Sequence, residues 1–242
     1  MIRLQSLGKK FGKRYIHQHL SMDIPTGERL CLVGGSGVGK SILMKMMLGL
    51  EDYQEGHIFF EEVEIGKMTE QDKVELMQKC GVVFQGAALF DSLTVRENIG
   101  LRLDEERELS GEEIDQRVAE VLEAVHLNPS IMPQFPAQLS GGMQKRVAIA
   151  RAIVHQPTYL FYDEPTTGLD PENAGNIDQL ILTLSEIGNT TSVIITHDLE
   201  TIKKVGTQVA MLSKEGLIFH DKAELFWSSM IPEVQRFVHR SQ

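Results

Sequence analysis

A glycine-rich run in the first quarter of the chain ends in lysine and serine, which are residue types that bind phosphate. It consists of Gly34, Gly35, Ser36, Gly37, Val38, Gly39, Lys40 and Ser41. The spacing matches the phosphate-binding pattern G-x-x-x-x-G-K-[ST], in which glycines let successive backbone N–H groups turn toward one anion. We expect Lys40 to reach the β- and γ-phosphates of a nucleoside triphosphate and Ser41 to ligate Mg²⁺.

Two carboxylates follow a short apolar run further along the chain. Residues 159–162 are Tyr-Leu-Phe-Tyr, and Asp163 and Glu164 come directly after them. If the run is a strand, both carboxylates lie at its carboxyl end, where ligands bind in open α/β sheets. We expect Asp163 to hold Mg²⁺ and Glu164 to act as the general base on an attacking water. A strand ending in Asp-Glu is common, so this interpretation depends on the glycine-rich run in the same chain.

A serine and two glycines mark the start of a second helix. Ser140 is a natural N-cap, and Gly141 and Gly142 leave the N–H groups of the first turn uncovered. The positive end of the helix dipole makes this turn a second candidate anion site, with a plain Ser-Gly helix start as the alternative. Two phosphate-binding helix starts beside one nucleotide motif indicate that two copies of the chain share each nucleotide.

Short apolar runs alternate with amphipathic ones, and these are the elements that must position the candidate residues. We expect strands near residues 30–33, 57–60, 81–84, 159–162 and 193–196, helices near 41–50, 112–125 and 140–154, and a hairpin of 211–212 with 217–219. This alternation favours an α/β fold with a mainly parallel sheet.

Composition limits the classes of protein that fit. The chain has 242 residues, of which 42% are hydrophobic and 24% charged, as in one layered globular domain with an insertion. No run approaches ~20 apolar residues, so we expect neither a membrane-spanning helix nor a secretory signal. Cys31 and Cys80 are too few for a disulfide framework or a zinc cluster, and a reducing cytoplasm is expected.

Charge is unevenly distributed along the sequence. The net charge is −10, which disfavours a nucleic-acid partner. Residues 51–78 contain nine acidic and two basic residues, a balance of −7, and residues 102–124 contain nine and three, a balance of −6. We interpret these acidic segments as solvated surfaces.

Taken in order, the motifs resemble those of the ATP-binding-cassette (ABC) ATPases over nearly the whole chain. Gln85 follows a strand, as the Q-loop of that family does, and His197 ends a strand, as the H-loop does. Ser140 opens a stretch similar to the family's signature, with Met143 where the family usually has Gln. The D-loop corresponds to Gly168, Leu169 and Asp170.

This resemblance implies a role for each matched residue. Gln85 contacts Mg²⁺ and His197 contacts the γ-phosphate. Phe11 stacks on adenine, although Tyr15 is a competing aromatic and a core position is the alternative for Phe11. In a head-to-tail homodimer, the ATP of one copy is also contacted by Ser140, Gly141 and Gly142 of the other, and Asp170 of the D-loop is a further nucleotide-binding residue.

The resemblance also implies a fold. It is the P-loop NTPase fold of ABC ATPases, a RecA-like α/β core with an antiparallel β portion near the N-terminus and an inserted helical subdomain. Residues 1–242 then form a single nucleotide-binding domain, with a core of 1–85 and 154–242 and a helical insert of about 86–153. The implied cofactors are ATP and Mg²⁺.

One segment is similar to a narrower group within this family. Residues 82–95 resemble the corresponding segment of ATPases that serve MCE-type lipid transporters, with Ala87 in place of a Gly, and residues 232–237 point the same way. This implies phospholipid transport through an integral membrane permease that docks near Gln85 to Phe90. It also implies an MCE-domain lipid-binding subunit and a position on the cytoplasmic face of the inner membrane.

Other interpretations of the chain remain open. Residues 88–90 fit simple packing between core and insert as well as docking. The run at 144–152 is shared with ATPases of polar amino-acid importers. A soluble ABC ATPase that acts on ribosomes or DNA is disfavoured, because the chain has one cassette, no long coiled-coil insert and no CxxC. A regulatory module without turnover is disfavoured because Glu164 and His197 are both present.

Overall fold

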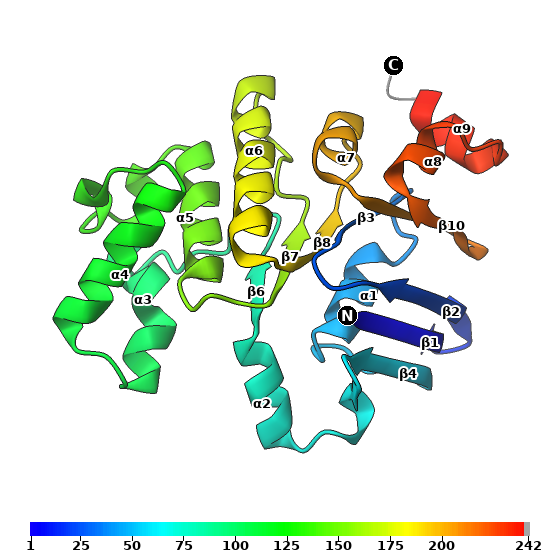
Figure 1. The fold of residues 1–242 in the computed structure, drawn as a ribbon, viewed down its shortest axis with the longest axis horizontal. Coiled ribbons are helices and arrows are strands. Elements are labelled where there is room, and N and C mark those ends of the chain that lie inside the picture. The colour runs from blue at the N-terminus through cyan, green and yellow to red at the C-terminus, as the bar shows by residue number, and fades with distance from the viewer. Residues whose placement is uncertain (240–242) are drawn as a thin grey trace.

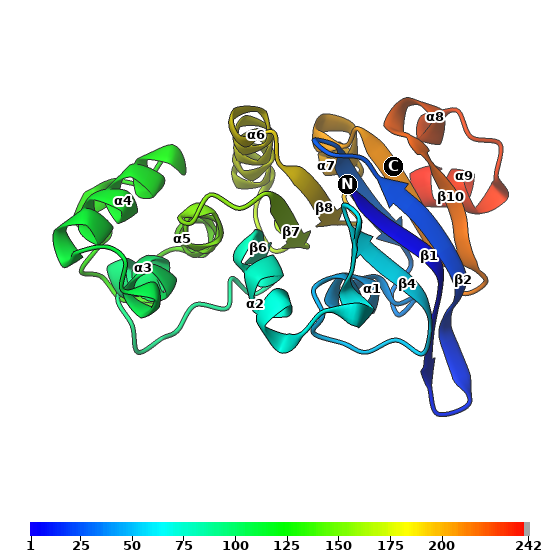
Figure 2. The same ribbon diagram turned by 60° about the horizontal axis from the view of Figure 1, so that its bottom comes forward.

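Two β-sheets form the centre of the molecule in the computed structural model, which describes residues 1–239 (Figure 1). The first sheet is antiparallel and has the strand order β2-β1-β4-β5. Its strands are β1 (Ile2–Phe11), β2 (Arg14–Ile24), β4 (Glu55–Phe60) and β5 (Val63–Glu64). The predicted antiparallel portion near the N-terminus is therefore confirmed, and its β1–β2 hairpin projects from the body of the molecule (Figure 2).

The second sheet has six strands in the order β10-β9-β3-β8-β7-β6. Its strands are β3 (Arg29–Gly34), β6 (Cys80–Val83), β7 (Tyr159–Asp163), β8 (Thr191–Ile195), β9 (Gln208–Ser213) and β10 (Gly216–Lys222). All neighbouring pairs are parallel except the β9–β10 hairpin. The α/β fold with a mainly parallel sheet is confirmed, and the carboxyl ends of β3, β7 and β8 meet at one edge.

Nine α-helices are described within residues 1–239. They are α1 (Lys40–Met47), α2 (Glu70–Gln78), α3 (Val95–Glu106), α4 (Gly111–Ala124), α5 (Gly141–Ile153), α6 (Pro171–Gly188), α7 (Leu199–Val205), α8 (Ala223–Trp227) and α9 (Pro232–His239). Short 3-10 turns occupy Ile65–Lys67, Pro129–Ile131 and Pro136–Gln138. In this part of the chain no helix has the length and apolar character needed to cross a membrane.

Helix α1 ends earlier than the predicted residue 50. Gly49 adopts φ +66°, a left-handed conformation that glycine adopts without steric cost. Its N–H donates to Met46 O at 3.1 Å, and the N–H of Leu50 donates to Lys45 O at 2.8 Å. These two bonds form a Schellman motif, which closes the helix at Leu48.

Buried side chains alternate between the two faces of the six-stranded sheet. Along β3, Leu30 and Leu32 pack toward α1 and the antiparallel sheet, whereas Cys31 and Val33 pack toward the other side. That other side carries α5 and α6, and α3 and α4 extend the same core outward (Figure 1). Helices therefore dominate residues 95–153, and the exact limits of the proposed insert, 86 and 153, stay a prediction.

Candidate active site

The glycine-rich run connects the end of β3 to the start of α1. Gly34 has φ +142°, and a Cβ on it would lie 2.3 Å from the carbonyl oxygen of Leu212. Gly39 has φ +99°, and its carbonyl contacts Nε2 of His17, on β2, at 3.0 Å. Both positions require glycine, and strand β2 of the other sheet thus supports the end of the loop.

An open cleft of about 580 Å³ lies over this loop. Most predicted site residues line it: Gly34, Ser36, Gly37, Gly39, Lys40, Ser41, Gln85, Asp163, Glu164 and His197, together with Ile42 and Ile195. Lys40 Nζ donates to the carbonyls of Gly34 at 2.8 Å and Gly35 at 3.2 Å. Burial lowers the pKa of Lys40, opposed by the charges of Glu164 and Asp163. The Lys40 side chain therefore folds back onto the glycine-rich loop, the same loop that is expected to bind phosphate.

Oxygen ligands from two elements meet across the cleft. Ser41 Oγ, in the first turn of α1, donates to Asp163 Oδ1 at 3.4 Å from the end of β7. Burial raises the pKa of Asp163, partly offset by that hydrogen bond. Within the described residues no group of three or more His, Cys, Asp or Glu side chains is arranged to hold a metal. Since Mg²⁺ is usually bound by one or two carboxylates plus substrate phosphates, this pair fits Mg²⁺ held together with a nucleotide.

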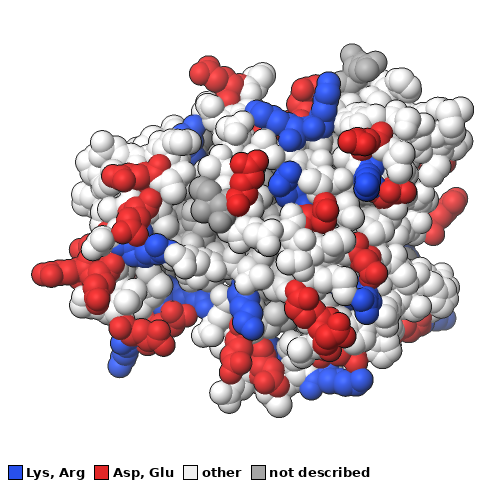
Figure 3. Space-filling view, viewed as in Figure 1, with Lys and Arg blue, Asp and Glu red and all other residues white. Residues whose placement is uncertain are grey.

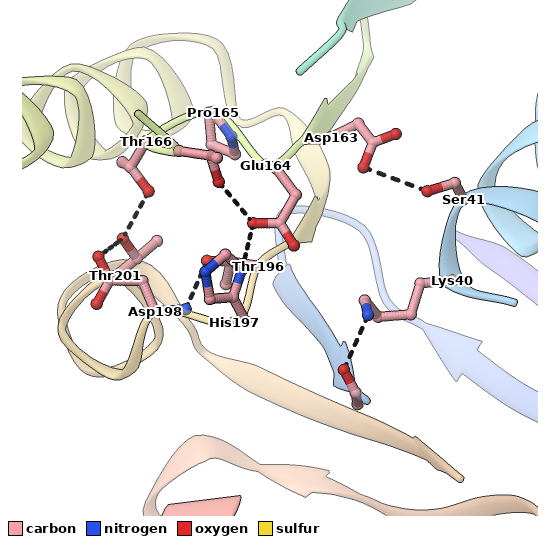
Figure 4. A network of polar contacts seen from close by, with 12 residues as sticks. Lys40, Ser41, Asp163, Glu164, Pro165, Thr166, Thr196, His197, Asp198 and Thr201 are labelled. Atoms are coloured by element: carbon pink, nitrogen blue, oxygen red, sulfur yellow. Dashed lines mark hydrogen bonds and ion pairs between the residues drawn. The ribbon is translucent and has the colours of Figure 1, made fainter. Parts of the chain in front are cut away.

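Glu164 is held from two sides. Its Oε2 accepts a hydrogen bond from Thr167 Oγ1 at 3.0 Å and lies 2.8 Å from His197 Nδ1 (Figure 4). The side chain is 14% exposed, whereas that of His197 is 65% exposed. Glu164 adopts φ +52°, and its N–H donates to Ile195 O at 2.9 Å. Left-handed backbone at a non-glycine residue is costly and tends to occur at functional sites, where neighbours enforce it.

Four further predicted residues, Ser140, Gly141, Gly142 and Asp170, form a second, separate group. Ser140 N-caps α5 and accepts a hydrogen bond from Met143 N at 3.3 Å. Asp170 N-caps α6 in the same way, through Asn173 N at 3.0 Å. A side chain on Gly142 would meet Asn173 Oδ1 at 3.5 Å, so the two helix starts are neighbours. None of these residues lines the cleft over the glycine-rich loop.

The first turns of the helices reveal which N-termini remain available to anions. Among the nine α-helices in residues 1–239, seven carry Asp or Glu in the first turn, and these are α2, α3, α4, α6, α7, α8 and α9. Only α1 and α5 carry none. An acidic side chain in that turn opposes the positive end of the helix dipole, so among the helices of residues 1–239 only these two lack such a carboxylate in their own first turn. They begin at the two predicted phosphate-binding sites.

Comparison with known proteins places the chain in a family. Residues 17–167, more than half of the chain, match the family described as ABC transporter. The chain is a member of this family. The ATP-binding cassette MJ0796, in a dimeric post-hydrolysis state bound to ADP and Pi, superimposes with a TM-score of 0.83 and 31% identity, covering 92% of this chain and 99% of that one. This chain is thus an ATP-binding ATPase with the ABC ATPase fold, as the motifs indicated.

Curated relatives of this ABC ATPase differ in their named substrates. The ATP-binding protein MlaF of the intermembrane phospholipid transport system of Haemophilus influenzae is 32% identical over 98% of this chain and 90% of its own length. The probable ribonucleotide transport ATP-binding protein mkl of Mycobacterium leprae is 33% identical over 98% of this chain and 68% of its own. The methionine import protein MetN of Clostridium tetani is 35% identical over 88% and 66%. The substrate is therefore not decided by similarity alone.

The predicted adenine contact lies apart from the cleft of this ABC ATPase. Phe11 is 50% exposed at the end of β1, so it is not a core aromatic, and Lys9 Nζ lies 4.8 Å from its ring centroid. Tyr15 is covered by Lys10 Nζ at 4.2 Å from its ring centroid and donates to Glu55 at 2.9 Å. Neither aromatic lines the cleft. Phe11 is the freer of the two rings, and its contact with adenine stays a prediction.

The segment after Gln85 has a backbone held from two helices. Ala87 and Ala88 adopt φ +61° and +48°, and their carbonyls accept hydrogen bonds from Arg151 on α5 at 2.9 and 2.8 Å. The N–H of Phe90 donates to Asn98 Oδ1 on α3 at 2.8 Å. Ala87 is buried, whereas the Phe90 ring is 51% exposed. The segment thus combines a backbone hydrogen-bonded to two helices with an exposed apolar side chain.

Two supporting residues of the site escaped sequence analysis. His17 contacts the glycine-rich loop from a distant strand, and no local pattern marks it. Thr167 was detectable in principle, because the third residue of a turn after a catalytic carboxylate is placed to bond back to it.

Proposed function

We propose that two copies of this ABC ATPase bind two ATP molecules at a shared interface. Each ATP would lie between the glycine-rich loop of one copy and Ser140, Gly141 and Gly142 of the other. One observation carries this proposal. The start of α5 is exposed, has no acidic residue in its first turn and lies outside the cleft over the glycine-rich loop of the same chain. The dimeric state described for MJ0796 supports it.

Hydrolysis in this proposal is performed by residues of the cleft. Ser41 and Asp163 would hold Mg²⁺, assisted by Gln85, and Mg²⁺ when bound neutralises charge on the phosphates. Lys40 would leave its carbonyl partners for the β- and γ-phosphates. Glu164 would take a proton from the attacking water. Since His197 and Thr167 both contact Oε2 of Glu164, Oε1 is the oxygen left to accept that proton.

ATP binding would close the dimer, and hydrolysis would reopen it. We propose that this cycle drives an integral membrane permease on the cytoplasmic face of the inner membrane. The permease would dock on the Gln85–Phe90 segment, whose hydrogen-bonded backbone and exposed Phe90 suit a short apolar helix.

The transported substrate in our proposal is phospholipid, with an MCE-domain lipid-binding subunit as a further partner. Two observations support it: the resemblance of residues 82–95 to ATPases of such systems, and the extent of similarity to MlaF of H. influenzae. Import of an amino acid is the second candidate. The run at 144–152 favours a polar amino acid, and the identity with the methionine import protein MetN of C. tetani favours amino-acid import more broadly.

Capture of the native assembly tests both candidates. The Glu164→Gln chain is expected to hold ATP without hydrolysing it, and so to stay in its closed assembly. It would be purified from native membranes in mild detergent with ATP, and its proteins and lipids identified by mass spectrometry. A multi-span permease with an MCE-domain protein and phospholipid supports lipid transport. A permease with a soluble amino-acid-binding protein supports import, and ribosomal or DNA-bound material without a membrane protein overturns both.

A further inference from the structure

A buried lysine connects the start of α5 to the loop that carries Glu164. Lys145 is only 9% exposed, although lysine is rarely buried without a partner. Its Nζ donates to the carbonyl of Pro165 at 2.9 Å and to that of Thr167 at 2.6 Å. No carboxylate lies within ion-pair distance of it among the described residues. The ammonium group is therefore used to hold backbone.

The loop held by Lys145 is the one that shapes Glu164. The N–H of Thr167 donates to Glu164 O at 3.3 Å, and Thr167 Oγ1 donates to the Glu164 carboxylate at 3.0 Å. Pro165 and Thr166 are buried between them. In the described chain no backbone N–H donates to the carbonyl of Pro165 or Thr167. Without Lys145, both carbonyls of this turn lose their only partner, and the turn loses its tie to α5.

We propose that Lys145 is a positioning residue for Glu164, acting through the Pro165 and Thr167 carbonyls. This inference rests on the proposed role of Glu164 as general base. Lys145 does not touch the cleft. Its effect is to keep Thr167 Oγ1 on Oε2 of Glu164, so that the carboxylate points its other oxygen at the attacking water.

The position of Lys145 on α5 extends its role to the pair of sites. It lies four residues after Gly141, or about 6 Å along the helix at 1.5 Å per residue. In the proposed dimer the start of α5 engages the ATP of the other copy, while Lys145 holds the catalytic loop of its own copy. The same helix would therefore contact the ATP of one site at its start and support the catalytic loop of the other site one turn later.

Three variants separate this role from simple loss of structure. Lys145→Met removes the N–H donors but keeps a side chain of similar length. Lys145→Gln retains N–H donors without the charge. Lys204→Met is a control of the same residue type, because Lys204 Nζ also donates to a backbone carbonyl, that of Gly175 at 2.8 Å, from an exposed position on α7. Each would be measured for kcat and KM of ATP hydrolysis, for ATP affinity with a fluorescent analogue, for Tm, and for hydrogen exchange of residues 164–169.

We expect Lys145→Met to lower kcat at least tenfold with ATP affinity within twofold of the parent chain, and to speed exchange in residues 164–169. Lys145→Gln should recover part of kcat, and Lys204→Met should match the parent. The inference is overturned if Lys145→Met keeps parental kcat, or if ATP affinity and kcat fall together. Should Lys145→Met not fold, Thr167→Val tests the same step, because it removes the hydroxyl through which Lys145 is proposed to act, and parental kcat in that chain overturns the inference. A Glu164→Gln chain with full turnover would instead overturn the role of Glu164 itself.

Discussion

The first turns of helices α1 and α5 are alike in sequence but lie in different surroundings. Both lack an acidic residue in the first turn, unlike every other α-helix described in residues 1–239. Helix α1 faces Asp163 and Glu164 across a cleft within its own chain, whereas α5 begins at an exposed serine outside that cleft. The predicted phosphate site at α1 thus has the predicted catalytic groups beside it, and the predicted site at α5 has none. The proposed dimer accounts for this difference, since each copy would then contribute one half of each of two sites.

The largest expected effect removes the catalytic group beside α1. Glu164→Gln should lower turnover by about 10²–10⁴-fold, because the amide cannot accept the proton of water. ATP binding should persist, and the dimer should accumulate with ATP in size-exclusion chromatography. Glu186→Gln, an exposed change on α6, is the control and should behave like the parent. Unchanged turnover in Glu164→Gln would remove Glu164 as the base.

A change at the start of α5 should stop hydrolysis without touching the cleft. Ser140→Arg places a bulky side chain where the other copy's ATP is proposed to bind, and should lower turnover by at least about 10²-fold. ATP binding by the monomer should stay at parental affinity, measured by titration at low protein concentration.

The N-cap of α4 offers a matched control for that experiment. Ser110 accepts a hydrogen bond from Glu113 N at 3.3 Å, as Ser140 does from Met143 N. Ser110→Arg should lose a similar cap, worth about 1 kcal/mol of stability, and keep full turnover. If Ser140→Arg instead weakens ATP binding by the monomer, the start of α5 acts within its own chain and the comparison with α1 fails.

A change at the start of α1 should have the reverse pattern. Lys40→Ala removes the cation that is expected to contact the β- and γ-phosphates, and should weaken ATP binding by the monomer about 10²-fold. Lys79→Ala, at the exposed end of α2, is the control. Near-parental affinity in Lys40→Ala, measured by equilibrium titration, would refute the phosphate-binding role of the glycine-rich loop.

The local parts of both sites could be predicted from sequence, because each depends on neighbours along the chain. Gly34 to Ser41, Asp163 with Glu164, and Ser140 are marked by spacing of only a few residues. The absence of acidic residues from the first turn of α5 is also visible in the sequence, since no Asp or Glu occurs at 140–143. It distinguishes α5 only once the starts of the other helices are known. Likewise Asp170 before Pro171 is a typical helix start, and α6 was not predicted from it.

The contacts that join distant elements could not be predicted. His17 reaches Gly39 from β2, and Lys145 reaches the loop after Glu164 from α5, through partners that only folding brings together. Strands β1 and β2 were expected only as an antiparallel region, because register shifts between Leu4 and Lys10 break the period-two alternation that marks a strand.

The acidic segments lie over α3, α4 and α2 as an exposed surface (Figure 3).

The smallest predicted effect exchanges one side chain between the starts of α4 and α5. Helix α4 has a capping box, in which Ser110 bonds Glu113 N and Glu113 bonds Ser110 N at 2.7 Å. Met143 occupies the position in α5 that Glu113 has in α4. Met143→Glu should complete the same box and stabilise the chain by about 0.3–1 kcal/mol, which raises Tm by a few degrees.

The same substitution should impair function, because its carboxylate opposes the dipole that the other copy's ATP is proposed to use. Turnover should fall by about two- to fivefold, the equivalent of 0.3–1 kcal/mol. Glu113→Met is the reciprocal control, expected to lower Tm and to leave turnover unchanged. Opposite changes in Tm and turnover for Met143→Glu would show that α5 gives up a local stabilising contact to keep its N-terminus open for a phosphate. A rise in Tm with full turnover would mean that the missing acid at α5 has no bearing on ATP.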